Sequence, residues 1–446
     1  LSDQIIVGGT ATIEDGAVLT VIYSGGIAPA GTTYDILTAD GGIDQLWSIQ
    51  NYPEGFTLTA ALFNGNTIAR LTSSSTVIVA PIFGTKNIGP GNPSRTNDYL
   101  NLLNYPSTGD IVDVVLALNT LDTSELDRAL DLINPAIFGI FPFINLDLNH
   151  LVAKQVENKL QKLCFSKDLE KNRFWISPYG NAIKTGTLGE LRGASSKARG
   201  ILAGYDHVLS KNHLLGVATG YDFSALKWDN IAGKADTHRV YGSIYANGQY
   251  DGLTAHSSIS AGRAEYDTIR KLEFAGIKRE AKSRHTGGFV NTHLGFNQEV
   301  YLKKHLFFFG DFDCSYLYEP SFLEEKADSL DLFVFKKDTF YLRSELGGKW
   351  EQRFEFLPYC LDFSGSFSWV CKTPLDNGIQ CSKLADFRED SPNLKVYTFG
   401  KSKSFFSPSF SFSCKKSHWT FSTHYQAELA HDYETHQMFV QGNWTF

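Results

Sequence analysis

The chain ends in the stretch HQMFVQGNWTF, which runs from His436 to Phe446. A chain terminus is usually polar and frayed, whereas strict alternation of apolar and polar residues predicts a half-buried β-strand. A chain can end on an ordered strand when that strand pairs with the first strand of a sheet and closes it into a barrel. Such closure removes both exposed edges of the sheet. The apolar or glycine positions of this predicted outward face are Met438, Val440, Gly442, Trp444 and Phe446.

The same alternation continues through most of the second half of the chain, from about Lys171 onward. In HWTFSTHYQAEL (418–429), for example, aromatic and aliphatic residues alternate with polar ones. Many of these runs are far longer than the usual strand of about 5–6 residues, and an even strand number is typical of closed membrane barrels. We predict 12 strands, at 172–182, 196–209, 213–226, 235–249, 252–267, 281–298, 304–319, 336–349, 353–371, 400–414, 417–433 and 435–446.

The predicted connections differ in length according to their order. Those after the second, fourth, sixth, eighth and tenth strands are short, whereas those after the first, third, fifth, seventh and ninth are longer and more polar. The longest covers 372–398, and only the last connection, near His431–Glu434, breaks the rule. Outer-membrane barrels have short turns at the periplasmic end and long loops outside, so this pattern favours such a barrel over a soluble sandwich.

The two faces of the strands differ in a way that indicates which one meets lipid. The apolar face is rich in Phe, Trp and Tyr, which suits an outward belt in a membrane. Twelve strands also enclose a lumen too wide for side chains to fill, since about eight strands already leave only that much room. By phase, the lumen should carry Asp311, Asp313, Arg343, Glu345, Lys349, Asp362 and Glu428.

Two regions precede the predicted barrel, which we assign to 171–446. Residues 1–80 read as short strands with Gly and Asp turns, typical of stacked β-solenoid rungs, with a small β-sandwich as the alternative. Residues 81–170 begin with a Pro- and Gly-rich linker and continue with helical patterns, one of them starting at a cap residue among Asp122, Thr123 and Ser124.

A longer helix is predicted at 148–163, immediately before the first barrel strand. It carries Lys154, Lys159 and Lys162 but only one acidic residue, Glu157, on its polar face. Because part of the predicted lumen is acidic, we expect this helix to thread the pore. The alternative is an ordinary helix packed against the solenoid.

Composition and motifs exclude several classes of protein. The net charge of −7 argues against a nucleic-acid partner, and we find no fingerprint of a metalloprotease, nucleotide-binding loop, serine hydrolase or dinucleotide fold. We therefore expect no enzyme activity, no cofactor and no metal site; Asp311 and Asp313 share a face but lack further catalytic groups. Cys371 and Cys381 either pair in an oxidising compartment or stay free thiols.

Taken as a whole, the chain resembles the carboxy-terminal part of a bacterial autotransporter, the type V secretion class. The resemblance rests on the terminal strand, on the order of solenoid, helical linker and 12-stranded barrel, and on GILAGYDHVLSKNHLLGVATGYDFSALKW (Gly200–Trp228), which matches an early hairpin of the family's barrel. One FxxN match (Phe63–Asn66) and GGTA (Gly8–Ala11) further resemble the chlamydial polymorphic membrane proteins, although the GGA[ILV] motif of that subgroup is not met.

The resemblance implies an all-β translocator in the bacterial outer membrane, with its linker helix in the pore and residues 1–80 as the last rungs of a surface-exposed passenger. It implies outer-membrane lipid, the barrel-assembly machinery and the passenger itself as partners, and a monomeric barrel. Since the chain starts at Leu1 and its only Met is Met438, we expect it to be part of a longer protein.

Three other functions fit the pattern less well. A general porin would share the barrel but not need the helix. A barrel enzyme would need a reactive cluster, for instance around Asp311 or His431. A soluble β-sandwich adhesin would need no lipid.

Overall fold

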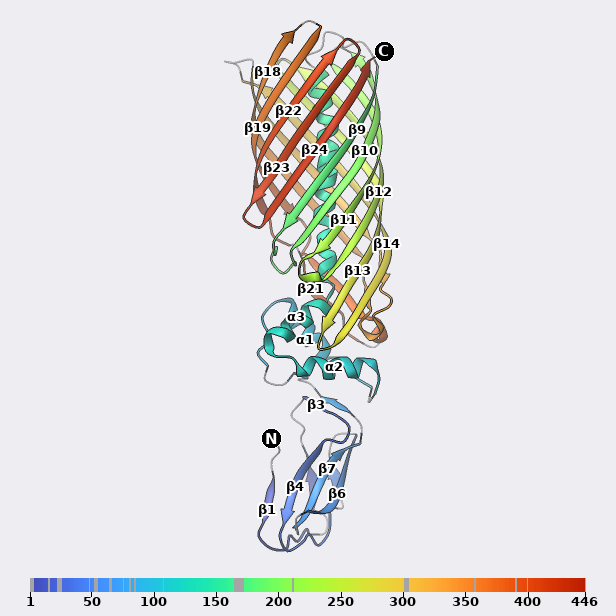
Figure 1. The fold of residues 1–446 in the computed structure, drawn as a ribbon, viewed down its shortest axis with the longest axis vertical. Helices are drawn as coiled ribbons and strands as arrows, with labels where there is room; N and C mark the ends of the chain where they lie inside the picture. Colours follow the sequence, from blue (N-terminus) through green and yellow to red (C-terminus); the bar gives the residue numbers. More distant parts are fainter. Residues whose placement is uncertain are drawn as a thin grey trace.

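The computed structural model describes residues 4–445 except 15–16, 22–25, 48, 52–54, 64–65, 75, 80–81, 84–85, 107, 164–171, 211, 301–304, 357, 390 and 399. Figure 1 shows an elongated molecule with the N-terminal strands at one end, a group of helices next, and a barrel that ends near the C-terminus. We call the barrel end that faces the helices the cap end, and the opposite end the turn end.

Twelve of the described strands close into one antiparallel barrel, so the predicted strand number and fold class are confirmed. The last strand pairs with the strand before it and, on its other edge, with the first barrel strand, from Tyr433 opposite Thr185 to Thr445 opposite Arg173. In chain order the barrel strands are β9 (Arg173–Thr185), β10 (Ala194–Ser210), β11 (His213–Trp228), β12 (Gly233–Tyr250), β13 (Leu253–Phe274), β14 (Ile277–Glu299), β15 (Leu306–Glu319), β18 (Lys337–Phe356), β19 (Tyr359–Pro374), β22 (Lys403–Lys416), β23 (Trp419–Ala430) and β24 (Tyr433–Thr445).

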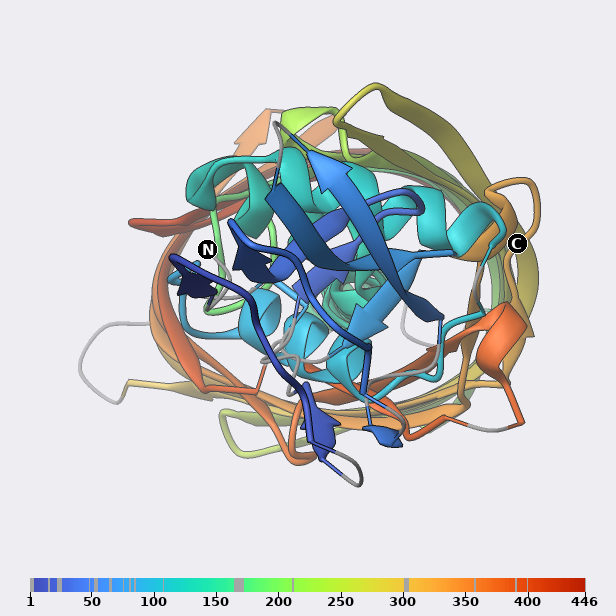
Figure 2. The ribbon, with the colours of Figure 1, turned by 90° about the horizontal axis from the view of Figure 1, so that it is seen from below.

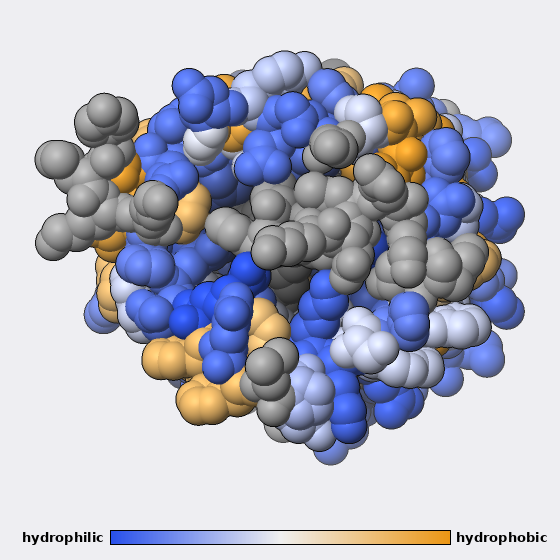
Figure 3. Space-filling model, turned by 90° about the horizontal axis from the view of Figure 1, so that it is seen from above, coloured by the Kyte–Doolittle hydropathy of each residue, from blue (hydrophilic) through white to orange (hydrophobic). Residues whose placement is uncertain are grey.

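The outer surface of the barrel carries large apolar side chains. Phe367, Ile244 and Trp369 are 65%, 61% and 59% exposed, and their neighbours in the strand point inward. The inward positions hold buried Ser, Thr, Asp, Arg and His side chains, while hydrophilic residues dominate the view onto the turn end (Figure 3). An apolar exterior around a polar interior is the arrangement of a membrane barrel.

The hairpins correct part of the predicted loop pattern. Asp251 and Gly252 have positive φ, as a two-residue type I′ turn requires, and this short turn was predicted. Between β13 and β14 a loop of 268–280 was predicted, but both strands continue to a tight turn at Ala275–Gly276, also with positive φ. The rule of long connections at one end therefore fails here as well as at 431–432. The hairpin continues because Leu272, Phe274 and Ala281 pack into the core that they share with the cap helices.

The two longest connections, 320–336 and 375–402, were predicted as loops but fold together. They form a small antiparallel sheet in the order β16–β17–β20–β21, together with two single turns of 3-10 helix. Its pairing joins segments about 50 residues apart, which short-range patterns do not reveal. The elements are β16 (Phe322–Leu323), η3 (Asp328–Leu330), β17 (Leu332–Val334), β20 (Ile379–Leu384), η4 (Ala385–Phe387) and β21 (Leu394–Tyr397); a further turn, η2 (Asp229–Ile231), follows β11.

Three helices cover the cap end: α1 (Asn92–Asn101), α2 (Asp110–Thr120) and α3 (Thr123–Ile133). Asp122 caps α3 and forms a capping box with Glu125, which settles the choice among the predicted cap residues. Their apolar faces share one core with the small sheet and the barrel mouth. The fork of the Arg279 guanidinium on Asp110 lowers the pKa of that carboxyl to about 2, so the pair stays ionised at neutral pH.

The long helix α4 (Ile140–Leu163) follows a 3-10 turn, η1 (Pro135–Gly139), and runs through the barrel. It begins eight residues earlier than the predicted 148, since Pro142 lies in the first turn, where a missing N–H costs nothing. Figure 1 shows α4 inside the strands from the cap end toward the turn end, and Figure 2 shows it behind the cap helices. Residues Pro135–Glu157 are apolar and long enough to cross a membrane, yet all of the most apolar window is buried inside the protein.

The N-terminal region consists of short strands: β1 (Ile5–Val7), β2 (Val18–Thr20), β3 (Gly26–Ala28), β4 (Thr33–Ala39), β5 (Ile49–Asn51), β6 (Phe56–Phe63), β7 (Asn66–Ser73) and β8 (Val77–Val79). Parallel pairing aligns Ile5 with Leu37 and Val18 with Ile49, offsets of 32 and 31 residues. These nearly equal offsets in residue number mean that the chain completes one coil between the two strands of each pair. The antiparallel hairpin β6–β7 then continues the sheet.

The cysteines that the structure describes are free thiols. They are Cys314, Cys360, Cys371, Cys381 and Cys414. In the structure, Cys371 and Cys381 are therefore free thiols and do not form a disulfide with each other.

The exposed apolar belt predicts how the barrel responds to a charge on its outer face. Ile244→Arg should lower the free energy of unfolding in lipid vesicles by about 2–4 kcal/mol, because an arginine near the bilayer midplane is poorly solvated. Leu209→Arg, next to a turn and 61% exposed, serves as the matched control and should cost about 0–1 kcal/mol. Equal effects, measured by denaturant titration, would contradict the assignment of this face to lipid.

Candidate functional site

The candidate site is the polar contact between α4 and the inner wall of the barrel. Asp147, His150, Lys154 and Glu157 follow one another at intervals of three or four residues, so they lie on one face of the helix. All four are buried. We call these four residues the polar stripe of α4.

At the beginning of the stripe, Asp147 meets two strands of the wall. Lys372 of β19 and the Tyr433 hydroxyl of β24 both donate to the Asp147 carboxylate. The Lys372 ammonium also lies 2.6 Å from an oxygen of Glu428 on β23. Asp147 thereby joins two wall strands directly, and Lys372 links a third.

The next turn of α4 places His150 against β15 and β18. The Nδ1 atom of His150 lies 2.8 Å from Asp313, and its Nε2 atom lies 3.7 Å from Glu345. Arg343 then donates to Glu345 at 2.9 Å and to Glu428 at 2.7 Å. The wall carboxylates around His150 are thus held in place by a buried guanidinium.

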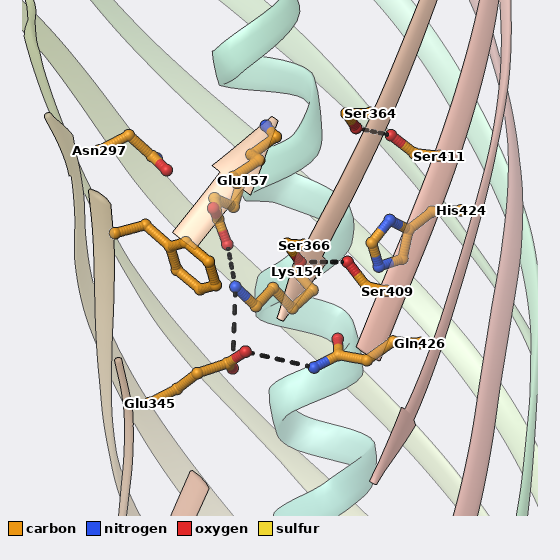
Figure 4. Close-up of a pocket in the computed structure, with 12 residues that line it drawn as sticks. Lys154, Glu157, Asn297, Glu345, Ser364, Ser366, Ser409, Ser411, His424 and Gln426 are labelled. Carbon is orange, nitrogen blue, oxygen red and sulfur yellow. Dashed lines mark hydrogen bonds and ion pairs between the residues drawn. The ribbon is translucent and has the colours of Figure 1, made fainter. Parts of the chain in front are cut away.

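Lys154 and Glu157 form the last part of the stripe. The Lys154 ammonium donates to Asp311 on β15 and lies 2.8 Å from Glu157. Figure 4 shows Lys154 and Glu157 beside a small polar cavity of about 30 Å³ that also reaches Glu345 and Gln426. Its other lining residues are Asn297, Phe309, Lys349, Ser364, Ser366, Ser409, Ser411 and His424.

A second attachment lies on the β12 side of the helix. The Arg239 guanidinium donates hydrogen bonds of 2.8–3.1 Å to the Asp222 carboxylate. Its remaining nitrogen donates to the side-chain oxygens of Asn145 and Asn149 at 3.1 and 3.0 Å. Since Arg239 is fully buried, these amide oxygens satisfy donors that would otherwise be unpaired at a large free-energy cost.

Among the described residues, these contacts join the polar stripe and the wall into one ionic network. It holds six carboxylates, three Lys or Arg cations and three imidazoles. Buried charges are tolerated only when paired and hydrogen-bonded. The helix therefore cannot leave the lumen without exposing or stranding charged groups of the wall.

The residues predicted to line the pore divide into two groups. Asp311, Asp313, Arg343, Glu345 and Glu428 belong to the ionic network and are buried. Lys349 pairs with Glu351 and lines the cavity, and Asp362 pairs with Arg353 at 2.7 Å near the β18–β19 turn.

Of the predicted basic positions on the helix, Lys154 takes part in the network. Lys159 and Lys162 lie in α4, but their side chains are outside the described part of the chain. In the terminal strand, Met438 and Trp444 face outward and are 49% and 48% exposed. Val440 and Gly442 are partly exposed, and Phe446 lies outside the described residues.

Sequence reasoning missed the partners that complete the network. They are Asp147, His150, His256, His293 and Lys372; Arg239, in the second attachment, was missed as well. The spacing of Asp147, His150, Lys154 and Glu157 along an otherwise apolar helix was the available signal for the stripe. The structure does not bring together the two groups considered for catalysis, since Asp311 is buried in the network whereas the side chain of His431 is 98% exposed at a turn.

Comparison with known proteins identifies the kind of barrel. Residues 174–391 match the family described as autotransporter beta-domain. The translocator domain of the autotransporter NalP from Neisseria meningitidis is similar, with 13% identity and a TM-score of 0.51 over 67% of this chain and 98% of that chain. The beta domain of the Bordetella autotransporter BrkA matches 62% of this chain and 100% of its own length at 11% identity and a TM-score of 0.46. The search of curated proteins found no match.

The network makes a prediction about single and double substitutions. Lys154→Met should lower the free energy of unfolding by about 3–5 kcal/mol, because it leaves buried carboxylates uncompensated. Lys154→Met combined with Asp311→Leu should recover part of this loss, since replacing both members of a buried pair by apolar groups is often neutral, whereas the Glu157 carboxylate, 2.8 Å from Lys154, stays buried. The measurement is denaturant titration of the refolded chain in detergent.

Lys395→Met, on exposed Lys395 of β21, is the control and should change stability by less than about 0.5 kcal/mol. A loss for Lys154→Met no larger than that of the control would contradict the buried pairing.

Proposed function

Since the chain carries an autotransporter beta-domain and lies in the outer membrane, we propose that it exports its own N-terminal segment through the barrel and anchors that segment at the cell surface. The observation that carries the proposal is the course of α4. The helix connects the cap end to the turn end through the lumen (Figure 1). Everything before it in the chain therefore lies on the cap side of the barrel.

The orientation of the barrel supports export rather than retention. Outer-membrane barrels keep short turns in the periplasm and long connections outside. Connections 320–336 and 375–402 both lie at the cap end, while Asp251–Gly252 is one of the short turns at the other. The cap helices and the N-terminal strands then lie outside the cell, and the C-terminus faces the periplasm.

We further propose the functional division of the chain. Residues 1–80 are the last rungs of the exported passenger, and the coil offset of about 32 residues supports a solenoid. Residues 81–170 are the linker with the pore helix, and 171–446 the translocator. With both edges paired in the closed barrel, no strand edge invites a second copy, so the translocator acts as a monomer.

The terminal strand has a proposed role before export. β24 pairs with β9 and closes the barrel, and its outward residues Met438 and Trp444 face the lipid side. A strand that is free until closure suits recognition by the barrel-assembly machinery.

Folding of the exported segment outside the cell supplies a driving force for export, since burial of apolar surface favours the folded state. The proposed mechanism therefore needs no nucleotide.

A general porin is the second candidate, and the helix distinguishes it. In planar bilayers the whole chain should conduct weakly, because α4 fills the lumen that twelve strands leave open. Deleting residues 148–163 should raise single-channel conductance several-fold if the helix is a plug. Unchanged conductance after the deletion would favour a porin with an independent channel.

The export proposal is tested on cells. The chain is given a secretion signal and an epitope tag before residue 4, is expressed in a Gram-negative host, and intact cells are treated with protease. We expect protease to remove the tag while the barrel stays in the outer membrane. A variant lacking residues 436–446, which cannot close the barrel, should show neither membrane barrel nor surface tag. A protected tag on a correctly inserted barrel would contradict export.

A further inference from the structure

Next to Lys154, four potential ligand atoms converge at the contact between helix and wall. They come from Glu157 on α4, His256 on β13, His293 on β14 and Asp311 on β15, and all lie within 4.8 Å of one another. The Nε2 atom of His256 lies 3.2 Å from Asp311 Oδ1 and 3.7 Å from Glu157 Oε2. All four side chains are at least nine-tenths buried.

His293 is held in an orientation that leaves one nitrogen unpaired. Its Nδ1 atom lies 2.9 Å from Asp313, and a carboxylate at this place accepts a hydrogen bond from the Nδ1–H group. Its Nε2 atom then presents a lone pair to the cluster, 3.7 Å from Asp311 Oδ1, and has no hydrogen-bond partner among the described residues. A carboxylate behind one nitrogen and an open second nitrogen is the arrangement that usually orients a metal-binding histidine.

The charges around the cluster also call for a cation. Among the described side chains of the ionic network, six carboxylates face three Lys or Arg side chains. Within this described set, the carboxylates exceed these cations by three if His150, His256 and His293 are neutral. Lys154 donates to Oδ2 of Asp311, so Oδ1 of the same carboxylate is left facing both imidazoles.

We propose that Glu157, His256, His293 and Asp311 bind one divalent transition-metal ion of the zinc class. Imidazole and carboxylate ligands suit zinc. In a tetrahedral zinc site with bonds of about 2.0–2.2 Å, neighbouring ligand atoms lie about 3.3–3.6 Å apart. The separations of 3.2, 3.7 and 3.7 Å for three of the six pairs here are close to this, and the whole set lies within 4.8 Å. One of the four residues, Glu157, also lines the small polar cavity beside Lys154 (Figure 4).

The site joins the pore helix to the wall. Three ligands come from adjacent barrel strands, and Glu157 alone comes from α4. A bound ion therefore fixes the turn-end half of the helix in the lumen, beyond what Lys154 achieves. The inference depends on the position of α4 and not on export, so a chain that exports but binds no zinc contradicts this inference alone.

The test uses the full chain refolded in detergent, with its cysteine thiols alkylated, and zinc chloride titrated against a competing dye. We expect one zinc ion per chain. His293→Asn can still donate to Asp313 but lacks the ligand nitrogen, and should weaken binding by about tenfold or more. His424→Gln is the matched control, because His424 lines the same cavity away from the cluster, and should bind as the unchanged chain does.

Two measurements guard against a variant that fails to fold. Each variant is checked for the faster migration of an unboiled barrel on a gel. X-ray absorption of the zinc-loaded, unmodified chain should show nitrogen and oxygen ligands with two imidazoles and no sulfur. Absence of stoichiometric binding, or equal binding by a chain with both His256→Asn and His293→Asn, would overturn the proposal and leave protonated imidazoles to balance the carboxylates.

Discussion

The structure depends on one constraint: charged groups inside a lipid-embedded barrel must find partners there. Twelve strands leave a lumen that their own side chains do not fill, and α4 occupies it. The helix carries Asp147, His150, Lys154 and Glu157. The first three of these pair with Lys372, Asp313 and Asp311 of the wall, respectively, and Glu157 pairs with Lys154. Because an unpaired buried charge is far more costly than an unpaired surface charge, this polar stripe fixes both the depth and the rotation of α4.

The same helix relates the two ends of the molecule. It begins beneath the cap, where the Arg270 guanidinium donates to the carbonyl oxygen of Leu132 at the end of α3 and to that of Leu330. The helix ends near the turn end, where β9 starts and where β24 pairs with β9. The cap helices, the helix in the lumen and β9 are thus successive parts of the chain, and β24 closes the barrel on β9.

Much of the fold could be predicted because strand alternation and helix periodicity are local signals. Each of the twelve predicted strands has its counterpart, and the phase that put Asp311 and Glu428 on the inner face needed no partner to be known. The small sheet of the loops, the long β13–β14 hairpin and the metal-ligand cluster could not be predicted in this way. The cluster, for example, depends on Glu157 of α4 and His256 of β13, which are far apart in the chain and meet only when the helix lies inside the wall.

The most direct measurement for this account is amide hydrogen exchange of residues 145–157 in the chain embedded in lipid. If the polar stripe holds α4 inside the barrel, these amides should exchange as slowly as those of the central residues of β13 to β15. Exchange as fast as in the exposed residues of α2 would contradict the placement of the helix in the lumen, and with it the ionic network on which the account depends.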